Sequence, residues 1–501
     1  MKLSVLAALA CPVALACLAA LPGAADAQSV VTYHNSPARS GQYTVPGLTL
    51  TTAAQLRLDS GFSATVSGSV YAQPLYWVPP GAASGWLIVA TESNLVYALD
   101  ANTGATIWQT QLGTPAPPGS LGCGNIDPEG VTGTPVIDPA SGTLYLDAMT
   151  VIGRHAIPRQ MIYALSLSDG KILPNWPLDV QVAMGARHVP FASKYQGERS
   201  ALQLFGGDVY VNYAGRAGDC GTYHGMVIEI SPAPTPTLAA SWATRAHRGG
   251  IWAQGGIATD GTSLYATTGN TVGASRWEDG EAVVRLLPGL AHSISTKDYF
   301  TPSDWKTLDN DDLDLGGTEA LPFTVPTTPS GTAPRVLALG KDGNAYLTNA
   351  ANLGGIGGQI ATLQVSTGKI ITAAAVYNGS TGTMVAFTNH GGTAGNCSGN
   401  NLTMLEVTSS ATTPLSVAWC AAFSGGGAPI ITTTDGTSDP IAWVVGAGAD
   451  NLLHGFNALT GKAVFSGGGV LMKGLHGFST LIAANGHLYV GADGTVYAFK
   501  F

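Results

Sequence analysis

The sequence is poor in charged residues, which make up 11% of its 501 positions, against roughly 25% in an ordinary globular domain. Glu, Lys and Arg are therefore too scarce for long helices or coiled coils. The formal net charge is −9, from 22 Lys and Arg against 31 Asp and Glu. No basic patch is present that could neutralise the phosphates of a nucleic acid or attract an anionic membrane surface. Nucleic-acid binding is thereby excluded.

Several motifs of familiar chemistry are also missing. No C-x-x-C or C-x-x-C-H run occurs, which argues against thiol redox chemistry, structural zinc and covalent haem. No nucleophile elbow, zinc-protease motif, phosphate loop or dinucleotide fingerprint stands in a suitable strand–helix context. The sequence instead holds 66 Gly and 29 Pro with a normal 45% of hydrophobic residues. That balance argues against disorder and predicts many short strands separated by turns.

The N-terminus has the pattern of an export signal. Lys2 is followed by an apolar stretch from Leu3 to Leu21, and Ala25-Asp26-Ala27 forms a small-x-small cleavage site before Gln28. We therefore expect a signal peptide over 1–27, one domain over 28–501, and a periplasmic or secreted protein. Lipid attachment at Cys17 stays open as the alternative. No later segment has 18 uninterrupted apolar residues, so no membrane span is expected.

Four cysteines remain beyond residue 27, namely Cys123, Cys220, Cys397 and Cys420. An even number of cysteines in an exported protein predicts disulfides. We expect Cys123 to pair with Cys220 and Cys397 with Cys420, which is one of three possible pairings.

A repeated unit runs along the whole chain after the export signal. Its clearest copy reads strand, turn, strand, turn, strand from Leu87 to Trp108, and its central strand recurs with spacings from 43 residues (453 to 496) up to 66 residues (96 to 162). The eight copies of this strand start at Val96, Ile162, Val227, Val283, Ala345, Leu405, Leu453 and Val496. Eight units of about four strands each predict an all-β fold, an eight-bladed β-propeller of four-stranded antiparallel blades, with seven blades as the alternative.

The best copy of the unit resembles the blade motif of pyrroloquinoline quinone (PQQ) dehydrogenases. The motif is Ala98-x-Asp100-x-x-Thr103-Gly104-x-x-x-Trp108. In this pattern the Trp packs between blades, and the Thr-Gly turn supplies a residue with positive φ. The resemblance covers nearly all of 28–501 and implies a PQQ-like propeller.

Two further segments are similar to the cofactor site of PQQ alcohol dehydrogenases. Gly249-Gly250-Ile-Trp252 resembles the segment whose Trp lies under the quinone, and Gly269-Asn270 resembles the strand end whose Asn binds Ca²⁺. Lys341-Asp342-Gly343 is similar to the strand whose Lys or Arg contacts the quinone oxygens. The resemblance implies that Trp252 and Lys341 bind PQQ and that Asn270 binds Ca²⁺. A blade-packing Trp, a turn Asn and a hairpin Lys are the structural alternatives.

The expected general base is less well matched. Thr301-Pro302-Ser303-Asp304-Trp305 is similar to a family segment that ends in the catalytic Asp, but Lys306 stands where that Asp would be. The resemblance implies that Asp304 or Asp311 takes the proton, and Asp309, Asp312 and Asp314 belong to the same acidic run. No counterpart of the family's metal-binding Glu is found in the blade from 144 to 163.

Other segments are similar to exported bacterial PQQ-binding-like repeat proteins without an established activity. They are Tyr33-His34-Asn35, Tyr71-Ala-Gln-Pro-Leu-Tyr76, Cys123-Gly-Asn-Ile-Asp127 and Gly130-Val-Thr-Gly-Thr-Pro135.

The preferred hypothesis for the function is PQQ- and Ca²⁺-dependent oxidation of an alcohol or sugar. Because no haem motif is present, a separate cytochrome is the expected electron acceptor. One alternative is a non-catalytic binding or assembly propeller that lacks the cofactor. Another is a propeller that acts on a polysaccharide through channel residues, for which the candidates are His34, Arg187, His188, Arg199, His224 and His247.

Overall fold

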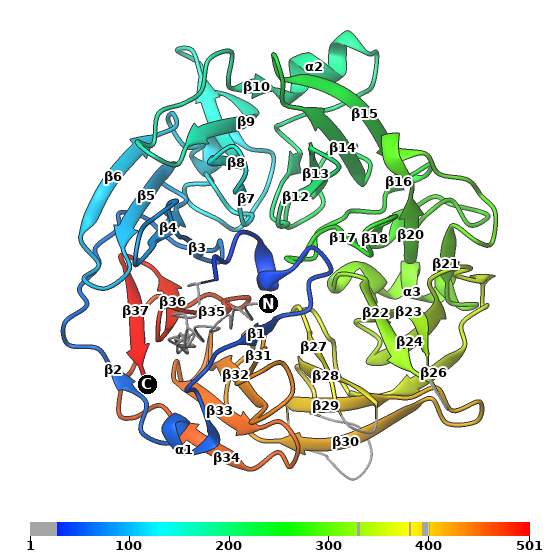
Figure 1. Cartoon of the computed structure of the whole chain (residues 1–501). Helices are drawn as coiled ribbons and strands as arrows, with labels where there is room; N and C mark the ends of the chain where they lie inside the picture. Colours follow the sequence, from blue (N-terminus) through cyan, green and yellow to red (C-terminus); the bar gives the residue numbers. More distant parts are fainter. Residues whose placement is uncertain (1–27, 328–330, 380–381, 393–398, 400) are drawn as a thin grey trace, which may run out of the picture.

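Eight small sheets are arranged as a ring around a central axis (Figure 1). The computed structural model describes residues 28–327, 331–379, 382–392, 399 and 401–501. Each sheet has a core of four antiparallel strands, as expected for chains in which apolar runs alternate with Gly-rich turns. The prediction of an eight-bladed propeller is confirmed, and the seven-bladed alternative is wrong.

The strands follow one another from the axis outward in each blade. The first four blades contain β3 (Leu75–Trp77), β4 (Trp86–Ala90), β5 (Leu95–Asp100) and β6 (Thr106–Gln111); β7 (Val136–Asp138), β8 (Thr143–Ile152), β9 (Ile157–Ser166) and β10 (Leu178–Asp179); β12 (Gln203–Phe205), β13 (Asp208–Gly215), β14 (Met226–Ser231) and β15 (Thr237–Ala243); and β17 (Ala258–Thr259), β18 (Leu264–Thr268), β20 (Ala282–Leu286) and β21 (Tyr299–Thr301). The next three contain β22 (Leu321–Pro326), β23 (Thr332–Leu339), β24 (Asn344–Asn349) and β26 (Ala361–Gln364); β27 (Ala375–Asn378), β28 (Thr383–Thr388), β29 (Leu402–Val407) and β30 (Leu415–Ala421); and β31 (Ile430–Thr433), β32 (Ile441–Val445), β33 (Leu453–Asn457) and β34 (Ala463–Ser466). The eighth contains β35 (Leu481–Ala484), β36 (His487–Ala492) and β37 (Thr495–Lys500).

The N-terminal part of the chain closes the ring. Strand β2 (Arg57–Leu58) is the outermost strand of the eighth blade and pairs with β37, where Arg57 lies opposite Lys500. Strand β1 (Gln42–Thr44) pairs in parallel with β31 on the inner side of the seventh blade. Residues 42–58 are thus hydrogen-bonded to the last two blades. Because β2 is present, β37 is paired on both of its sides.

The segment before β1 runs across the centre of the ring (Figure 1). It includes the 3₁₀ helix η1 (Tyr33–Asn35) and the fully buried Arg39. The Arg39 guanidinium donates to the carbonyl oxygens of Ile257 at 3.1 Å and Leu202 at 3.0 Å. These bonds attach the N-terminal segment to the inner edges of the third and fourth blades.

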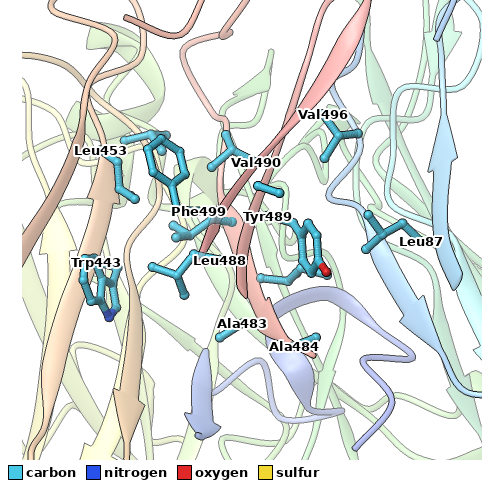
Figure 2. Close-up of a cluster of buried hydrophobic side chains, with 14 of the residues drawn as sticks. Leu87, Trp443, Leu453, Ala483, Ala484, Leu488, Tyr489, Val490, Val496 and Phe499 are labelled. Carbon is cyan, nitrogen blue, oxygen red and sulfur yellow. The ribbon is translucent and has the colours of Figure 1, made fainter. Parts of the chain in front are cut away.

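The hydrophobic core consists of side chains packed between neighbouring blades. Figure 2 shows one such region, in which Leu488, Tyr489 and Phe499 of the eighth blade lie between Trp443 of the seventh and Leu87 of the first. Burial of each large apolar side chain contributes roughly 1.5–3 kcal/mol. The strands are buried on both faces because each blade packs between two others.

The blade motif works as predicted at Trp108. The indole Nε1 donates to the Leu167 carbonyl of the next blade at 2.9 Å. A Cβ on Gly170 would lie 2.5 Å from the Trp108 ring, so only glycine allows this packing. Gly104 has φ of 77°, as expected for the turn before the Trp-bearing strand. Trp419 repeats the bond in the sixth blade, donating to Ala458 at 2.7 Å.

The remaining elements are short. They are α1 (Leu50–Ala53), α2 (Val180–Ala186), α3 (Trp305–Asp311), η2 (Pro118–Ser120), η3 (Pro288–Leu290), η4 (Leu315–Gly317), β11 (Gln196–Gly197), β16 (His247–Arg248), β19 (Thr271–Val272) and β25 (Gly355–Ile356). Within the described ranges, no helix has the length and apolar character needed to cross a bilayer.

One of the two expected disulfides is confirmed. Cys123 and Cys220 are bonded, which joins the loop before β7 to the loop before β14. The other expected pair includes Cys397, which lies outside the described residues, and so does the predicted signal peptide at 1–27.

Candidate functional site

Two glycine-rich segments of the fourth blade lie side by side. The Gly249 amide donates to the Asn270 carbonyl at 2.8 Å, and the Gly269 amide donates to the Gly250 carbonyl at 3.0 Å. The short strands β16 and β19 continue this pairing. Gly249 has φ of 67°, a conformation that favours glycine. The backbone thus places Trp252 and Asn270, 18 positions apart in the sequence, on the same wall.

The acidic run at the end of α3 packs against the same segment. The Asn270 amide donates to Asp314 Oδ1 at 2.8 Å. The next residue, Thr271, donates to Asp309 through both its amide and its hydroxyl, each at 2.7 Å. A Cβ on Gly269 would lie 2.6 Å from Asp314 Oδ1. Glycine at this position therefore allows the carboxylate to reach the backbone.

Lys341 completes the cluster from the turn between β23 and β24. Its Nζ lies 2.5 Å from Asp314 Oδ2 and 3.1 Å from Asp312 Oδ1. The same Nζ stands over the Trp252 ring, 5.2 Å from the centroid, a geometry that adds a cation–π attraction. Three residues chosen from sequence, Trp252, Asn270 and Lys341, therefore meet around one cavity.

This cavity, which we call the Trp252 pocket, has a volume of about 200 Å³. Its wall combines residues of the third, fourth and fifth blades. The aromatic and charged side chains that line it are Trp252, Tyr223, Arg199, Arg216, Asp219, Asp312, Asp314 and Lys341. Asn270 lines it as well. Basic and acidic groups thus face the same space.

Burial shifts the pKa values of the charged side chains in the pocket wall. It raises the pKa of Asp314 above that of an ordinary carboxyl, against the opposing effect of Lys341. Burial would lower the pKa of Lys341, but Asp314 and Asp312 outweigh it and raise that pKa overall. Behind them Glu281, whose pKa is raised strongly by burial and then by Asp314, accepts from the Leu315 amide at 2.6 Å. We therefore expect an ionised Lys341–Asp314 pair, and a Glu281 carboxyl that is harder to ionise than an ordinary one.

The two residues expected to act as the base lie elsewhere. Asp304 precedes α3 and Asp311 is its last residue, and both are exposed. Neither lines the Trp252 pocket, so a catalytic role for either stays a prediction. The acidic side chain that reaches Asn270 and Lys341 is Asp314.

Most of the candidate channel residues do not line the pocket. His34 is fully buried within the N-terminal segment, and Arg187 donates to the Leu238 carbonyl at the outer part of the third blade. His224 and His247 face each other with ring centroids 4.8 Å apart. Arg199 is the one of the six that lines the pocket. Sequence reasoning did not single out Arg216, which lies beside it.

Comparisons with known proteins show likeness at the level of the fold. No family model and no curated protein sequence matches the chain. Among solved structures it is similar to quinohemoprotein alcohol dehydrogenase from Comamonas testosteroni, with 14% identity, a TM-score of 0.63, and 94% of this chain and 80% of that chain covered. The chain shares its propeller fold with this dehydrogenase.

Two further structures agree with this assignment of the fold. A europium-containing methanol dehydrogenase gives 14% identity and a TM-score of 0.63, with 94% of this chain and 90% of that chain covered. A quinohemoprotein alcohol dehydrogenase from Pseudomonas putida HK5 gives 12% identity and a TM-score of 0.59, with 94% and 80% covered. The resemblance expected from the blade motif of this quinoprotein-like propeller is thus confirmed for the fold.

Proposed function

We propose that the Trp252 pocket binds PQQ and that the protein oxidises an alcohol or a sugar. The observation that carries the proposal is the convergence of Trp252, Asn270 and Lys341 on one pocket. They come from segments 249–252, 269–270 and 341–343, each chosen from sequence for a resemblance to the same kind of site. A structural role for each residue separately would not require them to meet.

The pocket wall fits an anionic, planar ligand. PQQ is flat and carries three carboxylates, so it needs an aromatic face and cations. Trp252 offers the face, and Arg199 and Lys341 offer the cations. Stacking on an indole together with charge-assisted hydrogen bonds is the expected mode of binding.

The wall fits a calcium ion less well. Ca²⁺ takes six to eight oxygen ligands, several of them carboxylates. Asp314 and Asn270 are adjacent, but Asp314 already accepts from the Asn270 amide and pairs with Lys341. Across the described part of the chain, no group of three or more His, Cys, Asp or Glu side chains could hold a metal ion. We therefore derive no step through calcium.

The chain's own residues would support oxidation as follows. The quinone, when bound, supplies the two-electron acceptor. Asp314 would take the hydroxyl proton of the substrate, because its raised pKa makes it a stronger base than an ordinary carboxylate. Lys341 would keep Asp314 ionised and orient it, and Trp252 would exclude water from one face of the site. A separate cytochrome would then accept the electrons.

The second candidate is a propeller that binds its ligand without oxidising it. It is favoured by the incomplete set of metal donors and by Arg216, whose buried guanidinium forms an ion pair with Glu129. A polysaccharide ligand would belong to this class. Either function fits an extracytoplasmic protein, for which the Cys123–Cys220 disulfide is support.

The test separates binding from turnover. The full chain is titrated with PQQ, with and without Ca²⁺, and the quinone absorbance and dye-linked oxidation of alcohols and sugars are recorded. We expect binding that Trp252→Ala weakens at least tenfold, while Trp242→Ala, a matched change at a half-buried Trp of β15, leaves it unchanged. Binding without dye reduction would favour the second candidate. Absence of PQQ binding would overturn the proposal.

A further inference from the structure

A second cavity lies at the axis of the ring. We call it the axial cavity, and it is separate from the aromatic wall of the Trp252 pocket. Several of its lining residues directly precede innermost strands: Tyr71 comes before β3, Thr132 and Thr134 before β7, Gln254 before β17, and Thr480 before β35. Tyr33 covers it from the N-terminal segment. Most of the segments that resemble exported repeat proteins without a known activity therefore meet here.

The axial cavity has a small volume, about 50 Å³. One water occupies roughly 10–15 Å³ on this measure. The cavity therefore holds a few waters, or a ligand with only a few non-hydrogen atoms. PQQ is several times larger, so this space suits a different and smaller molecule.

In the part of the chain that the structure describes, the Arg199 guanidinium has no hydrogen-bonded partner at the wall of the cavity. None of the ion pairs or hydrogen bonds found among the described residues includes its guanidinium. Two carboxyl groups lie near it, but Glu129 is paired with Arg216. Burial raises the pKa of the other, Glu92, to about 8, so Glu92 is mostly neutral at pH 7. An anion at Arg199 would supply the missing partner.

Two further polar atoms at the cavity have no partner. The buried Tyr33 hydroxyl and Gln254 Oε1 form no hydrogen bond with any described residue. A buried polar group without a partner costs roughly 1–3 kcal/mol. A ligand that carries a hydroxyl group could donate to Gln254 and accept from Tyr33.

The rest of the wall combines aromatic and apolar side chains with Asn125 and three threonines. The Tyr71 ring stacks on His476 with centroids 3.8 Å apart, and His476 Nε2 lies 2.7 Å from Asp493 Oδ1. Phe478 and Ile126 add apolar area. The Cys123–Cys220 disulfide fixes the loop that carries Asn125 and Ile126. The cavity is therefore held in shape without a ligand.

We infer that the axial cavity binds a small hydroxycarboxylate, with its carboxylate on Arg199 and its hydroxyl between Gln254 and Tyr33. This site shares Arg199 with the Trp252 pocket, but Tyr33 and Gln254 do not line that pocket, and hydroxycarboxylate binding does not require PQQ. The charge of Arg199 selects an anion, the unpartnered amide oxygen selects a hydroxyl donor, and the volume limits the ligand to the size of glycolate, lactate or glycerate.

Calorimetric titration of the full chain tests this inference. Glycolate, lactate and glycerate are the probes, with lactamide and ethylene glycol as neutral controls and phosphate and chloride as inorganic anions. We expect binding of the hydroxycarboxylates that is at least tenfold tighter than that of every control, because a hydrogen bond to a charged group contributes about that factor. Equal binding of lactamide or phosphate would overturn the inference, and so would no binding at millimolar concentration.

The variants locate the ligand. Arg199→Gln is expected to weaken binding at least tenfold, while the matched change Arg276→Gln, at an exposed arginine, leaves it within twofold. Tyr33→Phe and Gln254→Leu provide the same test if Arg199→Gln does not fold, since the first removes the hydroxyl and the second the side-chain amide at nearly constant volume. Trp252→Ala is expected to abolish PQQ binding but to keep hydroxycarboxylate binding. If Trp252→Ala weakens both, the small ligand is not in the axial cavity.

Discussion

Lys341 Nζ lies 2.5 Å from Asp314 Oδ2, and the two side chains are 15% and 5% exposed. The pair is thus formed inside the pocket wall rather than at the surface. Removing one partner of a buried ion pair leaves a charge without compensation, which costs more than the pair itself contributes. The two halves of the pair are not equivalent, because Lys341 has a second partner in the exposed Asp312.

We expect Lys341→Met to destabilise the protein by about 3–5 kcal/mol, the range for a broken buried pair. Asp314→Asn should cost clearly less, since Lys341 keeps Asp312 and the Asn side chain still accepts from the Asn270 amide. Urea unfolding of both variants measures the difference. Equal losses of stability would show that the carboxylate is not buried as described.

Trp108 and Trp252 are expected to respond differently to truncation. Trp108 is 9% exposed and donates to the next blade, so Trp108→Ala should cost about 3–5 kcal/mol. Trp252 is half-buried at a pocket, and Trp252→Ala should cost much less while removing ligand binding. Thermal unfolding and PQQ titration on the same samples distinguish the two roles. A large loss of stability in Trp252→Ala would assign it to blade packing instead.

The stability of the protein should fall as the pH rises from about 4.5 to about 8. Burial raises the pKa of Glu92 to about 8, whereas the unfolded chain has an ordinary carboxyl pKa near 4.3. Below both values the group is protonated in both states and its stabilising effect is complete. Between them the unfolded state releases the proton and the folded state keeps it, so unfolding becomes easier as pH rises.

Glu92→Gln is expected to reduce that slope. Glutamine is neutral at every pH, and its amide oxygen can accept from the Gly130 amide as Glu92 Oε2 does at 2.6 Å. Part of the slope should remain, because burial also raises the pKa values of Asp147 and Glu319, each to about 7. Melting temperatures at pH 5, 6, 7 and 8 provide the measurement. If the melting temperatures of Glu92→Gln and the wild-type protein differed by the same amount at all four pH values, the prediction would be contradicted.

The disulfide should stabilise the fold by closing a long loop. Cys123 and Cys220 are 97 residues apart, and a crosslink over such a distance contributes about 2–4 kcal/mol by restricting the unfolded chain. Replacing both cysteines with serine should lower the free energy of unfolding by that amount. Adding a reductant to this double variant should then cause little further loss of stability. Unchanged stability of the double variant would show that the crosslink is energetically silent.

The blades were predictable because their signal is local. Each of the eight strands counted in sequence coincides with the third strand of a blade, from β5 at Val96 to β37 at Val496. An apolar strand after a tight turn needs no distant contact to be recognised. Strand β2 gave no such signal, because Arg57 and Leu58 become a strand only through their pairing with β37.

The site was predictable in its aromatic and amide residues but not in its carboxylate. Trp252 and Asn270 stand in glycine-rich segments with a fixed spacing. Asp309, Asp311, Asp312 and Asp314 fall within six positions of each other, and only the end of α3 and the left-handed Asp312 decide that Asp314 turns inward. Arg199 was a candidate channel residue and Tyr33 stood in a segment similar to exported repeat proteins, but nothing in the sequence showed that the two line one cavity.

Closure through β2 and β37 also sets when folding can finish. Arg57 must meet Lys500, so the pairing that completes the ring has a very large sequence separation. Such contacts form slowly, because much of the chain's entropy is lost before they contribute. Until then β37 is an edge strand with unpaired backbone groups, which invites pairing with other chains. We therefore expect the yield of refolded protein to fall as the protein concentration rises, even though the completed ring is stable.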